Sequence, residues 1–160
     1  MKDMNRRDVF VALSAFAALG GVASASGQGL NGIVPSSDRV LSESEAFLYD
    51  KLPVHKNTNG GETRNVVTGV LVTGEAVELH QTLLPPGQMP HPPHKHQHSE
   101  FVMVREGSLE FNNDGKLQHV GPGDVVFAAS NVMHGWKNVG KTPARYFVIA
   151  IGRQNVAADV

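Results

Sequence analysis

The stretch GQMPHPPHKHQHSE, residues 87–100, holds four histidines and, together with His80, places five of the chain's eight histidines within nineteen positions. Alternate side chains of an extended strand lie on one face, so alternate residues from His94 to Glu100 would present three imidazoles and a carboxylate together. His91 would lie on the other face. Burying such groups without a partner is costly, and a divalent cation suits imidazole nitrogens and a carboxylate oxygen. The stretch therefore predicts a metal site on a strand.

A further ligand is expected from another part of the chain. His134 lies on a run that is predicted to be a later strand. A barrel would bring that strand opposite the histidine stretch, although the sequence alone leaves this contact open.

The chain from Val66 onward consists of short β-branched and aromatic runs separated by Gly, Pro, Asn or Asp, with no long helical period. Such punctuation is typical of an all-β sandwich or barrel. The turn residues between Phe111 and Lys116 predict a hairpin loop. Eight short strands without an internal repeat favour a single jelly roll. The expected strands are Val66–Thr73, Val77–Leu84, Phe101–Arg105, Ser108–Phe111, Leu117–Val120, Val125–Ala128, His134–Asn138 and Tyr146–Ile151.

The composition of the 160 residues supports one folded domain and excludes several functions. Hydrophobic residues make up 41% and charged residues 18%, a balance that can form a buried core. The formal net charge of -1 gives no electrostatic reason to expect nucleic acid or an anionic membrane as a partner. The chain has no cysteine, which excludes disulfides, thiolate nucleophiles and iron–sulfur clusters.

The first 25 residues have the features of an export signal. Arg6 and Arg7 resemble a twin-arginine motif. They precede an uncharged apolar stretch, Val9 to Val22, which is shorter than the ~20 residues needed to span a bilayer. Ala23-Ser24-Ala25 supplies a cleavage site. We expect export after folding, and a periplasmic or secreted mature protein that is not embedded in a membrane.

The mature chain divides into a linker and one domain. Residues 26–38 are rich in Gly, Ser and Pro, and are expected to form a flexible linker. Residues 39–160 would form the domain. Near its start, Ser42–Glu45 is either a capping box for a short helix or a turn before the first strand.

The histidine stretch resembles the first motif of the cupin family, in which a glycine is followed by His-x-His, a glutamate and a second glycine. Gly87, His94-Lys95-His96, Glu100 and Gly107 occur in this order, with six residues after Gly87 where the family has five. The match identifies the histidine stretch as the first cupin motif.

The second cupin motif is matched less completely. Gly123, His134 and Asn138 are in register with it, but Ala129 stands in place of a proline and Asn131 in place of a glycine. Asparagine tolerates the left-handed backbone better than other non-glycine residues, so we expect the turn to be kept at Asn131.

The resemblance covers roughly Val66 to Ile151. It implies a cupin-type double-stranded β-helix, which is a small single-domain jelly-roll β-barrel with one metal ion at its mouth. The ion would be a divalent transition metal, with manganese or iron favoured and zinc, nickel or copper as alternatives. Because the twin-arginine route moves proteins that have already folded, the site could be filled in the cytoplasm; outside it, availability would favour copper or zinc. The implied ligands are His94, His96, Glu100 and His134.

Four such ligands leave coordination positions for water, dioxygen or a substrate. The expected function is a metal-dependent enzyme, of oxygenase, isomerase or lyase type, that acts on a small organic substrate. Glu100 is also the candidate catalytic base. The alternative is a non-catalytic periplasmic protein that binds a small molecule or assists another protein, with a structural metal.

Three residues are candidates for the substrate pocket. Trp136 shares a strand face with the expected ligand two positions before it, although a plain core role is also open. His98 has no counterpart among the family's ligands and is expected outside the coordination sphere. Arg64 would bind a carboxylate substrate, or else be a solvated loop arginine. Either His80 or Gln81 is expected to face the cavity.

Oligomerisation is the last expectation. A single small barrel leaves an apolar sheet face or unpaired strand edges, which neighbouring copies commonly cover. We therefore expect a homodimer.

Overall fold

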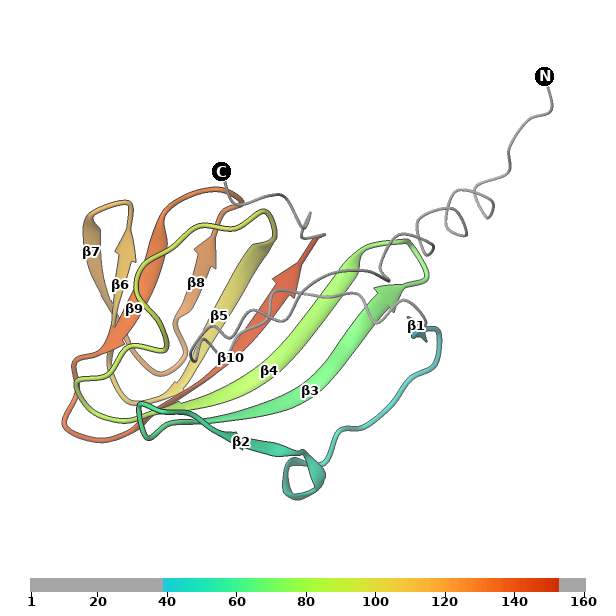
Figure 1. Ribbon diagram of the computed structural model, residues 1–160, viewed down its shortest axis with the longest axis horizontal. Helices are drawn as coiled ribbons and strands as arrows, with labels where there is room; N and C mark the ends of the chain where they lie inside the picture. The colour runs from blue at the N-terminus through green and yellow to red at the C-terminus, as the bar shows by residue number, and fades with distance from the viewer. Residues whose placement is uncertain (1–38, 153–160) are drawn as a thin grey trace, which may run out of the picture.

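The computed structural model describes residues 39–152, and the expected signal and linker lie outside the described residues. The described chain forms two β-sheets that pack against each other (Figure 1). The larger sheet has the strand order β1-β3-β4-β10-β5-β8, with β2 paired to β3, and the smaller has the order β7-β6-β9. The strands of the larger sheet are β1 (Val40–Leu41), β2 (Val54–Lys56), β3 (Glu62–Leu71), β4 (Ala76–Leu84), β5 (Ser99–Glu106), β8 (Val125–Ala128) and β10 (Ala144–Ile151). Those of the smaller sheet are β6 (Leu109–Asn113), β7 (Lys116–Val120) and β9 (His134–Asn138).

This all-β architecture confirms the predicted fold class. Each strand expected from Val66 onward has a counterpart in β3 to β10. The sequence did not predict β1 and β2, which are very short edge segments. It also placed the start of β3 too late, because Thr63 and Arg64 already pair with Thr82 and Gln81 of β4.

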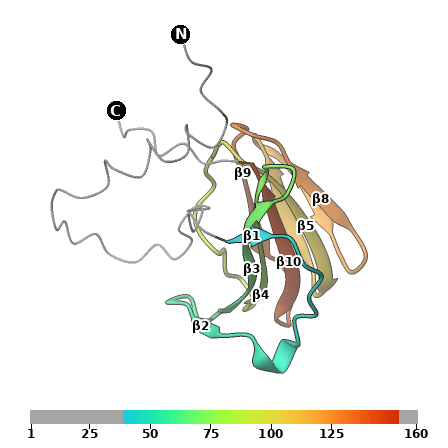
Figure 2. The same cartoon turned by 90° about the vertical axis from the view of Figure 1, so that its right-hand side faces the viewer.

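The segment Ser42–Glu45 is neither helical nor part of a strand. The short 3-10 helix η1 (Tyr49–Lys51) comes after it and has no side-chain cap, so of the two alternatives the capping box is not formed, and the segment follows the first strand instead of preceding it. Figure 2 shows the residues between β1 and β2 running alongside the large sheet. Among residues 39–152, no helix is long and apolar enough to cross a membrane.

The core lies between the two sheets because alternate strand residues point inward. Val102, Tyr146 and Val148 project from the larger sheet, and Phe111 and Trp136 project from the smaller one. All five are 4% exposed or less. Burial of this apolar surface stabilises the packing of the sheets.

Two turns show how local sequence fixes the path of the chain. Asp114 and Gly115 have φ angles of 49° and 86° and join β6 to β7, which confirms the predicted hairpin. Asn131 has a φ of 59°, so it occupies the left-handed region expected for it in the turn before β9.

The histidine stretch is not the extended strand that its spacing suggested. β5 begins only at Ser99, and His94 forms an isolated bridge with His134, in which each backbone N–H donates to the other's carbonyl at 2.9 Å. The three prolines of the stretch have no N–H and cannot continue a strand ladder. The stretch is instead a loop attached to the start of β9.

Candidate metal centre

Three imidazoles converge where the histidine loop meets β9. The ring centroids of His94 and His96 are 5.0 Å apart, those of His94 and His134 are 5.1 Å apart, and those of His96 and His134 are 4.6 Å apart. Each ring offers one nitrogen, and the three nitrogens lie within 4.8 Å of one another. The structure therefore brings together the three histidines that the sequence selected as ligands.

Backbone carbonyls determine which nitrogen two of these rings present to the centre. His96 Nδ1 lies 2.8 Å from the carbonyl oxygen of His98, and His134 Nδ1 lies 2.8 Å from that of Val132. A carbonyl oxygen only accepts, so each Nδ1 carries the proton and donates it. Each Nε2 is then left with a lone pair directed into the cluster, which is the form that a metal requires.

Glu100 lies on β5 and completes the cluster from the opposite sheet. Its Oε1 is 3.4 Å from His96 Nε2, and its Oε2 is 3.5 Å from His134 Nε2. Neither contact satisfies hydrogen-bond geometry, and these two nitrogens and Oε2 are buried without a hydrogen-bond partner. The Nδ1 atom of His94 is also buried without one.

His98 contacts both the carboxylate and one of the rings. Its Nε2 lies 3.1 Å from Glu100 Oε1, and its ring stacks on His96 with a centroid separation of 3.5 Å and an angle of 10° between the planes. It is 4% exposed, so it does not face solvent. His96, His98 and Glu100 form a second group of donors within 4.8 Å of one another, which overlaps the first.

The charges in the cluster favour cation binding. Burial raises the pKa of Glu100, but the imidazoles of His134, His96 and His98 lower it more, so its pKa lies well below the usual range. Burial, with the neighbouring imidazoles, lowers the pKa of His94 to about 4. Near neutral pH, Glu100 is therefore ionised and His94 is neutral, as metal ligation needs. Burial lowers the pKa of His134, but Glu100 and the hydrogen bond to the Val132 carbonyl together raise it more, so its net shift is upward.

This donor set fits a transition-metal ion. Several unpartnered buried polar atoms in one place are costly unless something binds them. Imidazole nitrogens with one carboxylate oxygen suit first-row divalent metals. The residues that would hold the ion are His94, His96, Glu100 and His134.

Trp136 lies on β9 two residues after His134, in the core between the sheets. Its ring stands 6.2 Å from that of His134 and 5.9 Å from that of Tyr146, the latter at an angle of 85°. Trp136 Nε1 and the Tyr146 hydroxyl are both buried without a hydrogen-bond partner among the described residues. The sequence did not select Tyr146, because an aromatic residue in a strand resembles ordinary core. Its unpartnered hydroxyl is visible only in three dimensions.

The inner face of β4 carries another buried pair. His80 points into the barrel and is 5% exposed, which resolves the choice between His80 and Gln81. Its Nδ1 lies 3.2 Å from Glu78 Oε1. Glu78 pairs through Ala150 with Glu100, so this dyad shares the inner face of the sheet with the candidate ligand.

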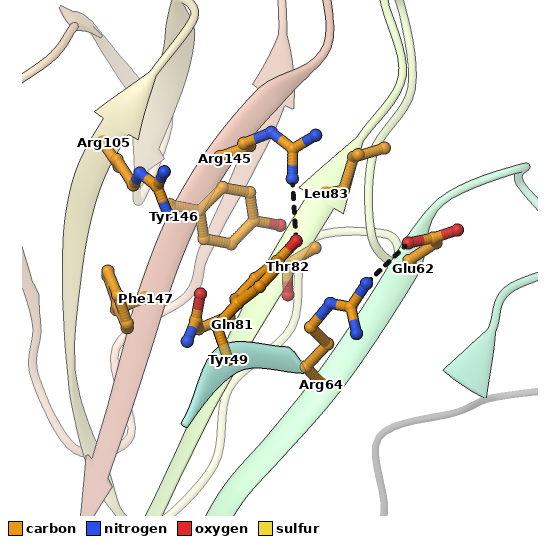
Figure 3. A pocket seen from close by; sticks show the side chains of 10 residues that line it. All are labelled: Tyr49, Glu62, Arg64, Gln81, Thr82, Leu83, Arg105, Arg145, Tyr146 and Phe147. Carbon is orange, nitrogen blue, oxygen red and sulfur yellow. Dashed lines mark hydrogen bonds and ion pairs between the residues drawn. The ribbon is translucent and has the colours of Figure 1, made fainter. Parts of the chain in front are cut away.

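Arg64 does not join the cluster. It lies on the outer face of the large sheet, opposite Gln81, and lines a small pocket with Tyr49 and Arg145 (Figure 3). Its guanidinium stands 4.4 Å above the ring of Tyr49, whose hydroxyl accepts a hydrogen bond from Arg145 at 3.3 Å. The structure thus places Arg64 on the other side of the sheet from the metal ligands.

His91 is a loop histidine, as its sequence neighbours suggested, but it does not lie on the far side of the cluster. Its ring packs edge-on against His94 at 4.1 Å and stands 6.1 Å from Trp136. It therefore forms part of the wall beside the cluster. The strand alternation used for the sequence placed it on the far side, and the loop conformation explains the difference.

The family model of the cupin domain matches residues 80–150. This range includes all four candidate ligands: His94, His96, Glu100 and His134. Among curated proteins, no sequence matches the chain.

Solved structures resemble this one over most of its described length. An RmlC-like cupin from Shewanella frigidimarina is 20% identical with a TM-score of 0.59, and the likeness covers 69% of this chain and 93% of that one. The polyketide cyclase RemF from Streptomyces resistomycificus is 18% identical with a TM-score of 0.57, covering 73% and 88%. A predicted oxalate decarboxylase from Thermotoga maritima is 21% identical with a TM-score of 0.57, covering 68% and 100%. At these identities, the likeness shows that the fold is that of the cupins.

Proposed function

We propose that this chain, a single-domain protein with the cupin fold, is a metal-dependent enzyme that acts on a small organic substrate. One observation carries the proposal. Four side chains of the types that bind metals converge, and each has a buried polar atom without a hydrogen-bond partner: His94, His96, Glu100 and His134. A purely structural barrel would gain nothing from leaving them unpartnered. The polyketide cyclase among the structural neighbours supports an enzymatic use of this fold.

The ion held by these residues would be a divalent transition metal, with manganese or iron favoured. When bound, it would supply Lewis-acid polarisation or oxygen activation. The chain's own contribution is to present two Nε2 lone pairs, fixed by the carbonyls of His98 and Val132, and one ionised carboxylate.

Glu100 would also act as a base during the reaction. Its Oε1 accepts a hydrogen bond from His98 Nε2 at 3.1 Å, which keeps the carboxylate oriented towards the centre. A substrate proton transferred to Oε2 would remain inside the buried cluster, because Oε2 has no other hydrogen-bond partner.

Trp136 and Tyr146 would orient the substrate. The indole N–H and the phenol O–H form no well-aligned hydrogen bond in the barrel interior, although Trp136 and Thr82 lie close enough to the phenol to lower its pKa against the effect of burial. Together they suit an acceptor oxygen, such as that of a carboxylate, an enol or a phenolic compound. We infer that the substrate belongs to one of these classes.

We also propose that the protein works outside the cytoplasm. The proposal is supported by Arg6-Arg7, the apolar stretch that follows and the Ala23-Ser24-Ala25 site. Mass spectrometry of the exported protein should find a chain that begins at Ser26. Replacing both arginines with lysine should leave the full-length chain in the cytoplasm.

The enzymatic proposal can be tested by loading the protein with Mn²⁺ and measuring water-proton relaxation. An open site should enhance the relaxation, and small carboxylates, enols or phenols that bind there should reduce the enhancement. The compounds that do so are then assayed for turnover with wild type, Glu100→Gln and, as a control on the same strand, Glu106→Gln. We expect turnover to be lost only in Glu100→Gln. Bound metal without exchangeable water would instead identify a structural metal in a non-catalytic cupin.

A further inference from the structure

The part of the histidine loop from Gly87 to His94 is attached to β9 at its two ends. At one end, Gly87 N–H donates to the carbonyl of Asn138 at 2.8 Å, and Asn138 N–H donates to that of Gln88 at 2.9 Å. At the other end, His94 and His134 exchange their two backbone hydrogen bonds. The three prolines between these ends have no N–H to donate. No backbone hydrogen bond joins the loop to β9 between its ends within residues 39–152, so packing holds its middle in place.

Gly135 is the residue of β9 on which this part of the loop packs. It follows His134 directly and is buried. A Cβ atom at this position would lie 3.1 Å from Pro93 Cα, 3.3 Å from its Cγ and 3.4 Å from its Cβ. Carbon atoms in ordinary contact are about 3.5–4.0 Å apart. The φ angle of Gly135 is outside the left-handed region, so the contact with Pro93, and not the backbone conformation, requires a glycine here.

A displacement of Pro93 would be passed on to His94. Pro92 and Pro93 are consecutive, and each pyrrolidine ring holds φ close to -65°. Such a stiff pair absorbs little movement within itself. His94 follows Pro93 directly, so it would move with the loop.

The position of His94 depends on the backbone more than that of the other two imidazoles does. The carbonyls of His98 and Val132 fix the rings of His96 and His134 through their Nδ1 atoms. The Nδ1 atom of His94 is buried without a hydrogen-bond partner among the described residues. The backbone bridge to His134 is therefore what holds this ligand in the cluster.

We propose that Gly135 is a positioning residue of the metal centre. Because it has no side chain, Pro93 can lie directly on β9, and this contact sets how far His94 reaches into the cluster. A side chain at position 135 would withdraw His94 and leave the other three candidate ligands in place. A metal ion held by three residues has one more position for water than an ion held by four. The inference rests on the metal centre proposed above, whereas the first test below does not.

The first test is amide hydrogen exchange, measured by NMR on the metal-free full chain. Gly135→Ala should speed up exchange of the His94 N–H by at least ~10-fold, because its bridge opens more often. The N–H of Asn138, at the other end of the loop, should keep its wild-type rate. Gly121→Ala is the matched control, because a Cβ at Gly121 would meet no described atom within 4 Å and its φ is also outside the left-handed region. Both rates should be unchanged in that variant.

Pro93→Gly tests the same contact from the side of the loop and keeps Gly135. It removes the ring that stiffens the chain before His94, so the His94 N–H should again exchange faster. This variant decides the question if Gly135→Ala does not fold. An unchanged rate at His94 in the folded variant would overturn the proposal, whatever metal the protein binds.

The second test is Mn²⁺ binding, followed by electron paramagnetic resonance and water-proton relaxation. Gly135→Ala should weaken binding by about 10–100-fold and increase the relaxation enhancement per bound ion, because the ion gains a water. The double variant Gly135→Ala/His94→Ala should bind no more weakly than His94→Ala, since the glycine acts through that histidine. Additive losses would overturn the role of Gly135. A wild type that binds no Mn²⁺ would instead overturn the metal centre itself.

Discussion

His134 and Asn138 lie four residues apart on β9, and both are 0% exposed, yet their polar atoms are used in opposite ways. Asn138 donates to the carbonyls of Leu84 and Thr142 at 2.8 and 2.9 Å, and its Oδ1 accepts from the N–H of Gly140 at 2.9 Å. His134 has its Nδ1 bonded to a carbonyl, but its Nε2 has no hydrogen-bond partner.

The difference separates a structural polar residue from a functional one. A buried polar group that makes all its hydrogen bonds stabilises the fold. A buried polar atom without a hydrogen-bond partner instead implies that a ligand binds it. Both residues lie in the stretch that resembles the second cupin motif, so the sequence alone could not distinguish their roles. The predictions below test this comparison, beginning with the largest effect.

Replacing Asn138 should have the largest effect on stability. Asn138→Ala removes the hydrogen bonds to two carbonyls and one N–H and leaves the buried carbonyl of Leu84 without this donor, so it should lower the free energy of unfolding by about 3 kcal/mol. Urea denaturation measures this, with Asn113→Ala at the exposed end of β6 as the control. A loss below about 1 kcal/mol would show that Asn138 is not the structural member of the pair.

Metal binding at His134, the first residue of β9, should stabilise the folded protein. A divalent ion at about 100 times its dissociation constant should raise the free energy of unfolding by about 2.7 kcal/mol, because it binds only the folded state. Thermal unfolding with and without Mn²⁺ measures this gain. His134→Gln should show no gain, and an equal gain in that variant would place the ion elsewhere.

His98 should have an intermediate effect through Glu100. Removing the hydrogen bond from His98 frees the carboxylate to turn, so His98→Ala should weaken metal binding by about 10–100-fold. His119→Ala on β7 is the control, since that histidine is exposed and lies on a strand that contributes none of the candidate ligands. Calorimetric titration compares the two, and equal affinities would remove the positioning role of His98.

The smallest effect is expected at the turn before β9. Asn131 has a φ of 59°, and its backbone N–H donates to the carbonyl of His96 at 2.7 Å. Asn131→Ala should cost about 1 kcal/mol, while Asn131→Gly should be nearly neutral, because glycine adopts this backbone without strain. Urea denaturation of the two variants compares their free energies of unfolding. An alanine variant more stable than the glycine variant would contradict the prediction.

Much of the fold could be predicted from the sequence, because the turn residues that separate strands and the alternation of buried and exposed residues along a strand are local signals. The pairing of His134 with the histidine stretch also follows once a barrel is assumed. The conformation of that stretch could not be predicted from spacing, because its prolines remove the N–H groups that a strand needs. The result is that His91 lies beside the cluster and not behind it.

Other features depend on contacts between distant parts of the chain. The face on which Arg64 lies follows from its pairing with Gln81 and from the bulge between Asn65 and Val67, which no local pattern encodes. Tyr146 looks like any buried aromatic residue until its hydroxyl is seen without a partner. The position of β8 at one end of the large sheet, among residues 39–152, likewise appears only when the sheet order is known.

The most direct test of the account is the metal content of three proteins exported by their own signal: wild type, His134→Gln and Asn138→Ala. Elemental analysis with electron paramagnetic resonance should find near-stoichiometric metal in wild type and in Asn138→Ala, and none above background in His134→Gln. Metal retained in His134→Gln, or absent from wild type after loading, would contradict the claim that the open donors on β9 and β5 form a metal centre.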